Sequence, residues 1–215
     1  MNRPTRIVPA ILTDDPKTLK TMIRQAETFT SYVQFDIMDG QFVPSHSISC
    51  EHLASVPKKL DWEAHLMTRR PEEQLDCLQK AGARKMVFHF EATPSPEAII
   101  AQARHLGLGV GLAINPETPV SAFLPLTSTV DSILFLTVHP GFYGSQFMPE
   151  VLDKIVELRN TRPNADIGVD GGIKESNVAQ IAQLGVNSIY VGSAIFMQTD
   201  PAASFRRLTE LAQGA

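Results

Sequence analysis

The sequence lacks the features that mark several classes of protein. It contains only two cysteines, Cys50 and Cys77, too few for the disulfide framework of a small secreted domain, and we interpret both as buried thiols in a reducing compartment. No run of about 18 apolar residues occurs, so no membrane span is expected. The segment MNRPTRIVPAILTDD has no long apolar stretch, so no signal peptide is expected. These absences predict a cytoplasmic protein that does not associate with membranes.

Excess charge of one sign is also missing. Lysine and arginine total 19 and the acidic residues total 23, which gives a net charge of −4 with no basic cluster. A nucleic-acid partner is therefore not expected. The chain has 215 residues, of which 43% are hydrophobic and 20% charged, the balance of a globular protein with a sizeable core. No linker or low-complexity segment interrupts it, so we expect one domain over residues 1–215.

The sequence does contain a regular alternation of strand and helix patterns. Short apolar or β-branched runs predict strands at 6–12, 32–38, 61–67, 85–92, 109–116, 132–140, 166–172 and 188–196. Helical patterns follow them at 16–29, 49–57, 71–82, 95–107, 120–128, 148–162, 174–185 and 200–214. Such alternation indicates a parallel sheet with right-handed crossovers, and eight units in this length predict an α/β fold, a (β/α)8 TIM barrel. An open doubly wound sheet is the alternative.

Polar residues recur at the predicted carboxyl ends of the strands. In a barrel of this type the active site lies at these ends, so the recurrence indicates one shared pocket. The residues are Asp36, Asp39, His65, His89, Asn115, His139, Asp170, Gly192 and Ser193.

The stretch VQFDIMDG (33–40) carries two of these acids in what is otherwise a buried strand. Gln34, Asp36 and Met38 share one face of the strand, and the apolar residues between them share the other. The apolar face is expected to meet the helices. Asp36 should then point into the barrel, where a carboxylate without a partner would be costly. Asp39, at the end of the strand, is interpreted as a turn residue.

Glycines follow the last two strands. The pairs Gly171-Gly172 and Gly192-Ser193 would let backbone N–H groups approach an anion closely. Barrels of this type often bind phosphate after strands 7 and 8, so a phosphate site is predicted there. The loop 139–147, HPGFYGSQF, has two glycines around two aromatic residues and is predicted to fold over a ligand.

Two carboxylates and a phosphate site suggest a particular reaction. One carboxylate can remove the weakly acidic proton beside the ketone of a sugar phosphate, and another on the opposite face can return one, so that the carbon inverts through an enediolate. The enediolate oxygen needs a metal or fixed donors. Asp36 and Asp170 are candidate acid–base residues, and with His65 they are candidate ligands for a divalent ion.

Six segments, taken together and in order, form a specific pattern. They are FDIMDGQFVP (35–44), EAHLM (63–67), NPETP (115–119), TVHPGFYGSQF (137–147), VDGGI (169–173) and VGSAIF (191–196). This pattern resembles the ribulose-phosphate 3-epimerase family over nearly the whole chain. The resemblance implies a (β/α)8 barrel that interconverts ribulose 5-phosphate and xylulose 5-phosphate with a divalent metal, commonly zinc, iron, manganese or cobalt. It also implies a homo-oligomer, either a dimer or a hexamer.

The resemblance further implies a role for each matching residue. Asp36 and Asp170 would be the acid–base pair and also metal ligands, with His65 as a third ligand. The substrate and phosphate site would be lined by His65, Met38, Met67, Gly141, Phe142, Tyr143, Gly144, Gly171, Gly172, Gly192 and Ser193.

Three positions depart from the family's pattern. Gln34 stands where the family has a histidine ligand, Ala10 where it has a serine that contacts substrate, and Tyr143 where the loop has a glycine. A carboxamide oxygen is a poorer zinc ligand than imidazole and suits harder ions. Gln34 therefore stays an open choice as a fourth metal ligand. The site is expected to bind metal weakly, to prefer manganese or magnesium, or to work without metal.

These departures leave other functions open. One is the epimerisation of another ketose phosphate, such as allulose 6-phosphate. Another is a sugar-phosphate-binding protein with weak or no activity. A lyase related to the hexulose-phosphate synthases would carry an Asp-x-Lys-x-x-Asp motif. The matching segment here, Asp36-Ile37-Met38-Asp39, has no lysine, which argues against that function.

Overall fold

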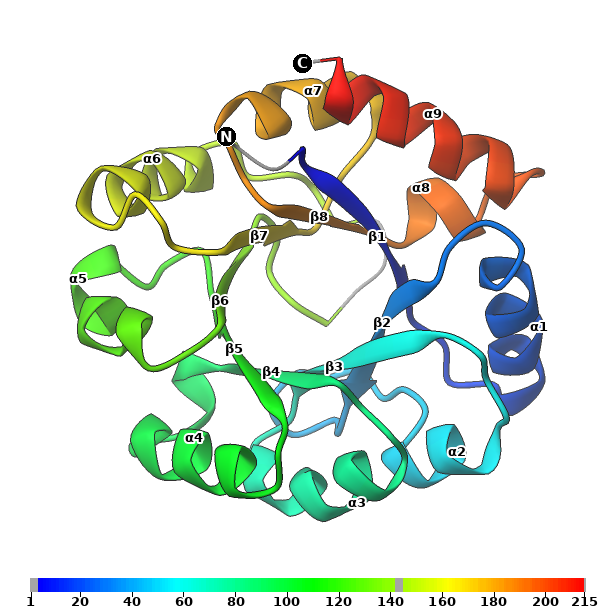
Figure 1. Cartoon of the computed structure of the whole chain (residues 1–215), viewed down its shortest axis with the longest axis horizontal. Helices are drawn as coiled ribbons and strands as arrows, with labels where there is room; N and C mark the ends of the chain where they lie inside the picture. Colours follow the sequence, from blue (N-terminus) through cyan, green and yellow to red (C-terminus); the bar gives the residue numbers. More distant parts are fainter. Residues whose placement is uncertain (1–3, 142–144, 215) are drawn as a thin grey trace.

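Parallel strands form a closed barrel in the order β1 to β8, and helices surround it (Figure 1). The computed structural model describes residues 4–141 and 145–214. The strands are β1 (Arg6–Ile11), β2 (Tyr32–Met38), β3 (Asp61–Met67), β4 (Lys85–His89), β5 (Gly109–Ile114), β6 (Ser132–Leu136), β7 (Ile167–Asp170) and β8 (Ser188–Val191). The prediction of a (β/α)8 barrel is confirmed, and the open doubly wound sheet is excluded because β1 pairs with β8.

The helices lie outside the barrel, between consecutive strands (Figure 1). They are α1 (Pro16–Ala26), α2 (Cys50–Ser55), α3 (Leu75–Lys80), α4 (Pro96–His105), α5 (Val120–Phe123), α6 (Val151–Thr161), α7 (Glu175–Gln183), α8 (Ser193–Phe196) and α9 (Pro201–Gln213). Short 3-10 helices, η1 (Pro71–Gln74), η2 (Phe90–Ala92) and η3 (Leu124–Ser128), adjoin α3, β4 and α5.

Two of the predicted strands, 32–38 and 61–67, have the observed bounds. The predicted strand 188–196 is wrong in its second half, because β8 ends at Val191 and α8 begins at Ser193. A short apolar run has the composition of either element, so the pattern could not separate them. The predicted strands 85–92 and 132–140 are also too long, because β4 ends at His89 and β6 ends at Leu136.

The helix starts follow from local capping. Asp15 accepts hydrogen bonds from the backbone N–H groups of Lys17 and Thr18, and Pro16 occupies the first helical position of α1. Asp200 caps α9 in the same way by accepting from the backbone N–H of Ala203. These side chains satisfy N–H groups that have no partner inside the helix.

The main core lies between the outer face of the strands and the helices. As predicted for β2, its apolar residues Val33, Phe35 and Ile37 belong to this core and are buried. The ring of Phe35 packs edge-on against Trp62 of β3, with 5.4 Å between the ring centroids. The opposite face of β2 points into the barrel, so its polar residues share the interior.

A cluster of polar side chains fills the barrel interior near the amino-terminal ends of β2, β3 and β4. Glu63 is fully buried, and its Oε2 lies 2.6 Å from Nζ of Lys85 and accepts a hydrogen bond of 2.7 Å from the Tyr32 hydroxyl. Lys85 also donates to Ser132 at 3.2 Å. Burial first, and then the charge of Glu63, raise the pKa of both Tyr32 and Tyr190. At this level the interior is therefore a packed core that contains a buried ion pair.

The interpretation of the cysteines as free thiols is wrong. Cys50 at the start of α2 and Cys77 in α3 form a disulfide, with 6.1 Å between their Cα atoms. Neither cysteine is free. The two helices are neighbours on the outside of the barrel, and this tertiary contact brings together residues 27 positions apart. Spacing along the chain carries no sign of such a pairing.

Among the described residues, no helix combines the length and the apolar character needed to cross a membrane.

Candidate active site

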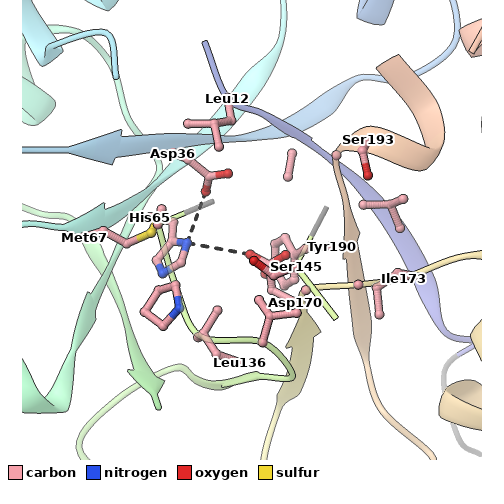
Figure 2. Close-up of a pocket in the computed structure, with 18 of the residues that line it drawn as sticks. Leu12, Asp36, His65, Met67, Leu136, Ser145, Asp170, Ile173, Tyr190 and Ser193 are labelled. Carbon is pink, nitrogen blue, oxygen red and sulfur yellow. Dashed lines mark hydrogen bonds and ion pairs between the residues drawn. The ribbon is translucent and has the colours of Figure 1, made fainter. Parts of the chain in front are cut away.

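A pocket opens at the carboxyl ends of the strands, as predicted (Figure 2). Its walls come from β1, β2, β3, β6, β7 and β8 and from the loops that follow several of them. The lining residues are Ala10, Leu12, Asp36, Met38, His65, Met67, Leu136, Val138, Pro140, Gly141, Ser145, Asp170, Gly171, Gly172, Ile173, Tyr190, Val191, Gly192 and Ser193.

Three titratable side chains converge at the floor of this pocket. Asp36 on β2 lies beside His65 on β3 in the strand register, and Asp170 ends β7. Nδ1 of His65 is 3.1 Å from Oδ1 of Asp36 and 3.7 Å from Oδ2 of Asp170 (Figure 2, dashed lines). One ligand atom from each residue lies within 4.8 Å of the others, so the three side chains can hold one cation together.

Gln34 lies one layer deeper and joins the two acids. Its Nε2 is 3.2 Å from Oδ1 of Asp36 and 3.2 Å from Oδ2 of Asp170, and it donates to both. Gln34 is fully buried, and its Oε1 has no hydrogen-bond partner within the described part of the chain. A carboxamide thus offsets part of the repulsion between two carboxylates in the barrel interior.

The donor set fits a divalent cation. Two carboxylates and one imidazole are ligands that zinc and the harder first-row ions accept. The partnerless Oε1 of Gln34 adds an oxygen next to this set. A half-turn of the carboxamide exchanges Nε2 and Oε1, which would present that oxygen to the ion instead of the N–H groups.

The surroundings shift the proton affinity of two of these groups. Burial, and then the charge of Asp36, raise the pKa of Asp170 to about 7. Burial opposes protonation of His65, but the hydrogen bond and charge of Asp36 and the charge of Asp170 outweigh it and raise the pKa of His65. A carboxyl group that titrates near neutrality can both give and take a proton at physiological pH.

The glycines predicted to bind phosphate line the same pocket. Gly171 and Gly172 have φ angles of 111° and 66°, a region that disfavours other residues. A Cβ on Gly171 would come within 2.5 Å of the Val138 side chain. At the neighbouring strand, Gly192 follows β8 and Ser193 is the first residue of α8. At Gly171, Gly172 and Gly192 the backbone therefore lines the pocket without a side chain.

The structure separates the other predicted residues into those at the pocket and those outside it. Met38, Met67 and Gly141 line the walls. The predicted substrate contacts Phe142, Tyr143 and Gly144 lie outside the described residues. The side chain of Asp39 accepts from the backbone N–H groups of Gln41, Phe42 and Arg69, which supports its interpretation as a turn residue.

The predicted location of His139 needs correction. The expectation that it belongs to the shared pocket is wrong, because its side chain is 69% exposed and pairs with Glu117 at 3.0 Å. β6 ends at Leu136, four residues before the predicted end of the strand, so His139 lies in the loop that follows it. His89 and Asn115 also lie outside the pocket wall, in a buried cluster behind His65.

Several lining residues were not singled out from the sequence. Leu12, Leu136, Val138 and Ile173 give the pocket apolar walls, and apolar residues at strand ends carry no signal that separates a wall from a core. Tyr190 could have been found, because the alternation of Ser188 and Tyr190 in β8 places both on the inner face.

Comparisons with solved structures define the class of fold. The chain matches 3-hexulose-6-phosphate synthase from Salmonella typhimurium with a TM-score of 0.73 at 18% identity, covering 97% of this chain and 98% of that one. It matches phosphoribosyl anthranilate isomerase from Thermococcus kodakaraensis with a TM-score of 0.70 at 14% identity, covering 99% and 100% of the two chains. At these identities the likeness shows a shared barrel fold.

Sequence comparisons define the family. The model of the ribulose-phosphate 3-epimerase family matches residues 6–196. The chain is 36% identical to ribulose-phosphate 3-epimerase from Schizosaccharomyces pombe, over 91% of this chain and 89% of that protein. It is 34% identical to the cytoplasmic isoform from Oryza sativa subsp. japonica, over 98% and 95% of the two chains. The chain belongs to the ribulose-phosphate 3-epimerase family, whose members are isomerases.

Proposed function

We propose that the protein interconverts D-ribulose 5-phosphate and D-xylulose 5-phosphate by inverting the configuration at C3. Family membership and the names of the relatives support the reaction class. The observation that carries the proposal is the pairing of two carboxylates. Asp36 and Asp170 come from strands that are not neighbours, and both reach the floor of one pocket.

Inversion at C3 needs one base on each face of the substrate. One of the two aspartates takes the C3 proton, and the electron pair of the broken C–H bond moves into an enediolate with C2. The other aspartate, in its protonated form, delivers a proton to the opposite face of C3. The raised pKa of Asp170 suits it to hold that proton at neutral pH. The reverse reaction exchanges the two roles, and no other reactant is consumed.

The remaining pocket residues orient the substrate. Backbone groups of Gly171, Gly172, Gly192 and Ser193 would receive the phosphate, because all four residues line the pocket and glycines leave the backbone N–H groups accessible to an anion. Met38 and Met67 line the same pocket, and their apolar side chains would cover the sugar carbons and keep water from the carbon that is deprotonated.

A divalent cation has a place in this scheme. Asp36, His65 and Asp170 would hold it, with the carboxamide oxygen of Gln34 as a further ligand after rotation. When bound, the cation would stabilise the negative charge that develops on the enediolate oxygens.

Exchange with solvent deuterium tests the proposal. Purified protein in deuterium oxide should introduce deuterium at C3 of ribulose 5-phosphate, detected by NMR or mass spectrometry, and should do so more slowly with allulose 6-phosphate.

Asp36→Asn and Asp170→Asn should each lower turnover by about 100- to 10,000-fold, the usual contribution of one acid–base group, while phosphate still binds. Absence of exchange with either ketose phosphate would exclude the epimerase. An active Asp170→Asn protein would exclude the two-base scheme.

A further inference from the structure

Behind the candidate metal ligand His65 lies a second histidine that the proposed reaction does not use. His89, the last residue of β4, is fully buried, and its Nε2 lies 3.0 Å from Nε2 of His65. The two rings are stacked, with 5.1 Å between their centroids. Two imidazole nitrogens at this distance share one proton, so one nitrogen donates and the other accepts.

The far side of His89 decides which nitrogen donates. Nδ1 of His89 faces Oε2 of Glu91 at 3.6 Å. Both atoms are buried and have no closer hydrogen-bond partner among the described residues, and the same holds for Oδ1 of Asn115. A proton on Nδ1 of His89 gives these atoms a donor, whereas a lone pair there would face a carboxylate oxygen.

Burial sets the charge of the His89 ring. His89 is fully buried, and burial disfavours a charged imidazole, so the ring is neutral and carries one proton. The other oxygen of Glu91, Oε1, accepts from the backbone N–H of Asn115 and from the Thr118 hydroxyl, as a carboxylate does. Oε2 is therefore the acceptor that faces Nδ1 of His89.

We infer that His89, oriented by Glu91, is a positioning residue that keeps the proton of His65 on Nε2. With its own proton on Nδ1, His89 can only accept at Nε2, so Nε2–H of His65 donates to it. Nδ1 of His65, which faces Asp36 and Asp170, is then the nitrogen that can take a cation. Outer partners that fix the tautomer of a ligating histidine are a general feature of metal sites. The metal-binding role of His65 rests on the proposed function, but the proton positions do not.

Glu91→Gln should invert the chain of hydrogen bonds. Oε1 of Glu91 accepts from the backbone N–H of Asn115 at 3.0 Å and from the Thr118 hydroxyl, so the oxygen of a glutamine must stay on that side. Its NH₂ group would then face His89 and donate to Nδ1. His89 would carry its proton on Nε2 and donate to His65, whose own proton would move to Nδ1. That proton would occupy the position that a cation needs.

Two measurements test the inference. ¹⁵N NMR of histidine-labelled, metal-free protein should show Nε2 of His89 without a proton in the parent protein and with one in Glu91→Gln. Isothermal titration with manganese should show affinity lower by about 10- to 100-fold in Glu91→Gln, the usual effect of losing such a partner. Glu117→Gln is the matched control, since it removes the same charge from the exposed pair with His139 and should change neither result.

The outcomes separate this inference from the proposed reaction. A proton on Nε2 of His89 in the parent protein, or the same tautomer in Glu91→Gln as in the parent, would overturn it. Unchanged manganese affinity in Glu91→Gln despite an inverted tautomer would overturn the link to His65. Failure of the epimerase proposal would appear as absence of deuterium exchange and would leave the NMR result as it stands.

Discussion

Nε2 of Gln34 lies 3.2 Å from Oδ2 of Asp170, although 136 residues separate the two in the sequence. The same nitrogen lies 3.2 Å from Oδ1 of Asp36, so one carboxamide joins the two carboxylates at the floor of the pocket. The resemblance places a histidine ligand at position 34. The geometry therefore ties the chain's main departure from its family directly to its acid–base pair.

Gln34→His should tighten zinc binding. The substitution offers an imidazole in place of an amide, and zinc favours nitrogen ligands over a neutral amide oxygen. Because this is a change of ligand, the gain in affinity should exceed the about 10- to 100-fold typical of changes around the ligands. Competition with a chromophoric chelator measures zinc and manganese affinities for both proteins. Tight stoichiometric zinc in the parent protein would contradict the view that Gln34 disfavours it.

Asp170 should make the metal-free protein less stable as the pH rises. Its pKa is about 7 in the folded protein, and 3.8 is the value for an unperturbed carboxyl. Between these values the folded state holds a proton that the unfolded state has lost, so the free energy of unfolding falls as the pH increases.

Asp170→Asn removes this dependence. With a chelator present, the variant should gain stability relative to the parent between about pH 4 and about pH 7, as measured by urea unfolding at several pH values. The exposed carboxylate of Asp61, paired with Arg84 on the surface, provides a control through Asp61→Asn. Parallel stability curves for the parent and Asp170→Asn would show that Asp170 keeps an ordinary pKa.

Much of the fold and the centre of the site could be predicted because both depend on local pattern. Side chains alternate between the two faces of a strand, which predicted that Gln34 and Asp36 point into the barrel. Active sites of such barrels lie at the carboxyl ends of the strands, which predicted that Asp36, His65 and Asp170 share one pocket. These rules need only the neighbours of a residue and the closure of the barrel.

The parts that could not be predicted depend on contacts between distant segments. The direction in which the Gln34 amide points is set by Asp170, and the Cys50–Cys77 bond is set by the packing of α2 on α3. The place where β6 ends decides that His139 faces solvent, and the apolar run SILFLTV continues past that point. No spacing along the chain encodes these relationships.

The buried pair of Glu63 and Lys85 should matter for stability but not for turnover. Glu63→Leu leaves Lys85, whose side chain is 15% exposed, without its carboxylate partner, and it leaves the Tyr32 hydroxyl without that acceptor. Lys85 keeps its hydrogen bond to the neutral Ser132 hydroxyl. Loss of one partner of a buried ion pair costs about 3–5 kcal/mol. The free energy of unfolding in urea should fall by this order, while kcat of the folded enzyme stays unchanged.

Two further variants locate the cause of that loss. Removing both charges in Glu63→Leu/Lys85→Leu should recover part of it, since no charge is then left buried alone. Arg84→Ala, which breaks an exposed pair with Asp61, should cost less than about 1 kcal/mol. A Glu63→Leu protein as stable as the parent would mean that Lys85 reaches water or another acceptor.

The disulfide should stabilise the protein without taking part in turnover. Cys50 and Cys77 close a loop with a sequence separation of 27 residues. A cross-link of this kind restricts the conformations of the unfolded chain and raises the free energy of unfolding by about 2–4 kcal/mol. Adding dithiothreitol should lower the free energy of unfolding by this order. Cys50→Ala/Cys77→Ala should unfold at the same urea concentration with and without the reductant, which separates the bond from other effects of dithiothreitol.

Because α2 and α3 lie on the outside of the barrel and no cysteine lines the pocket, kcat should be the same in the oxidised and reduced proteins. Equal unfolding curves for the parent with and without reductant would show that the two thiols do not pair in solution.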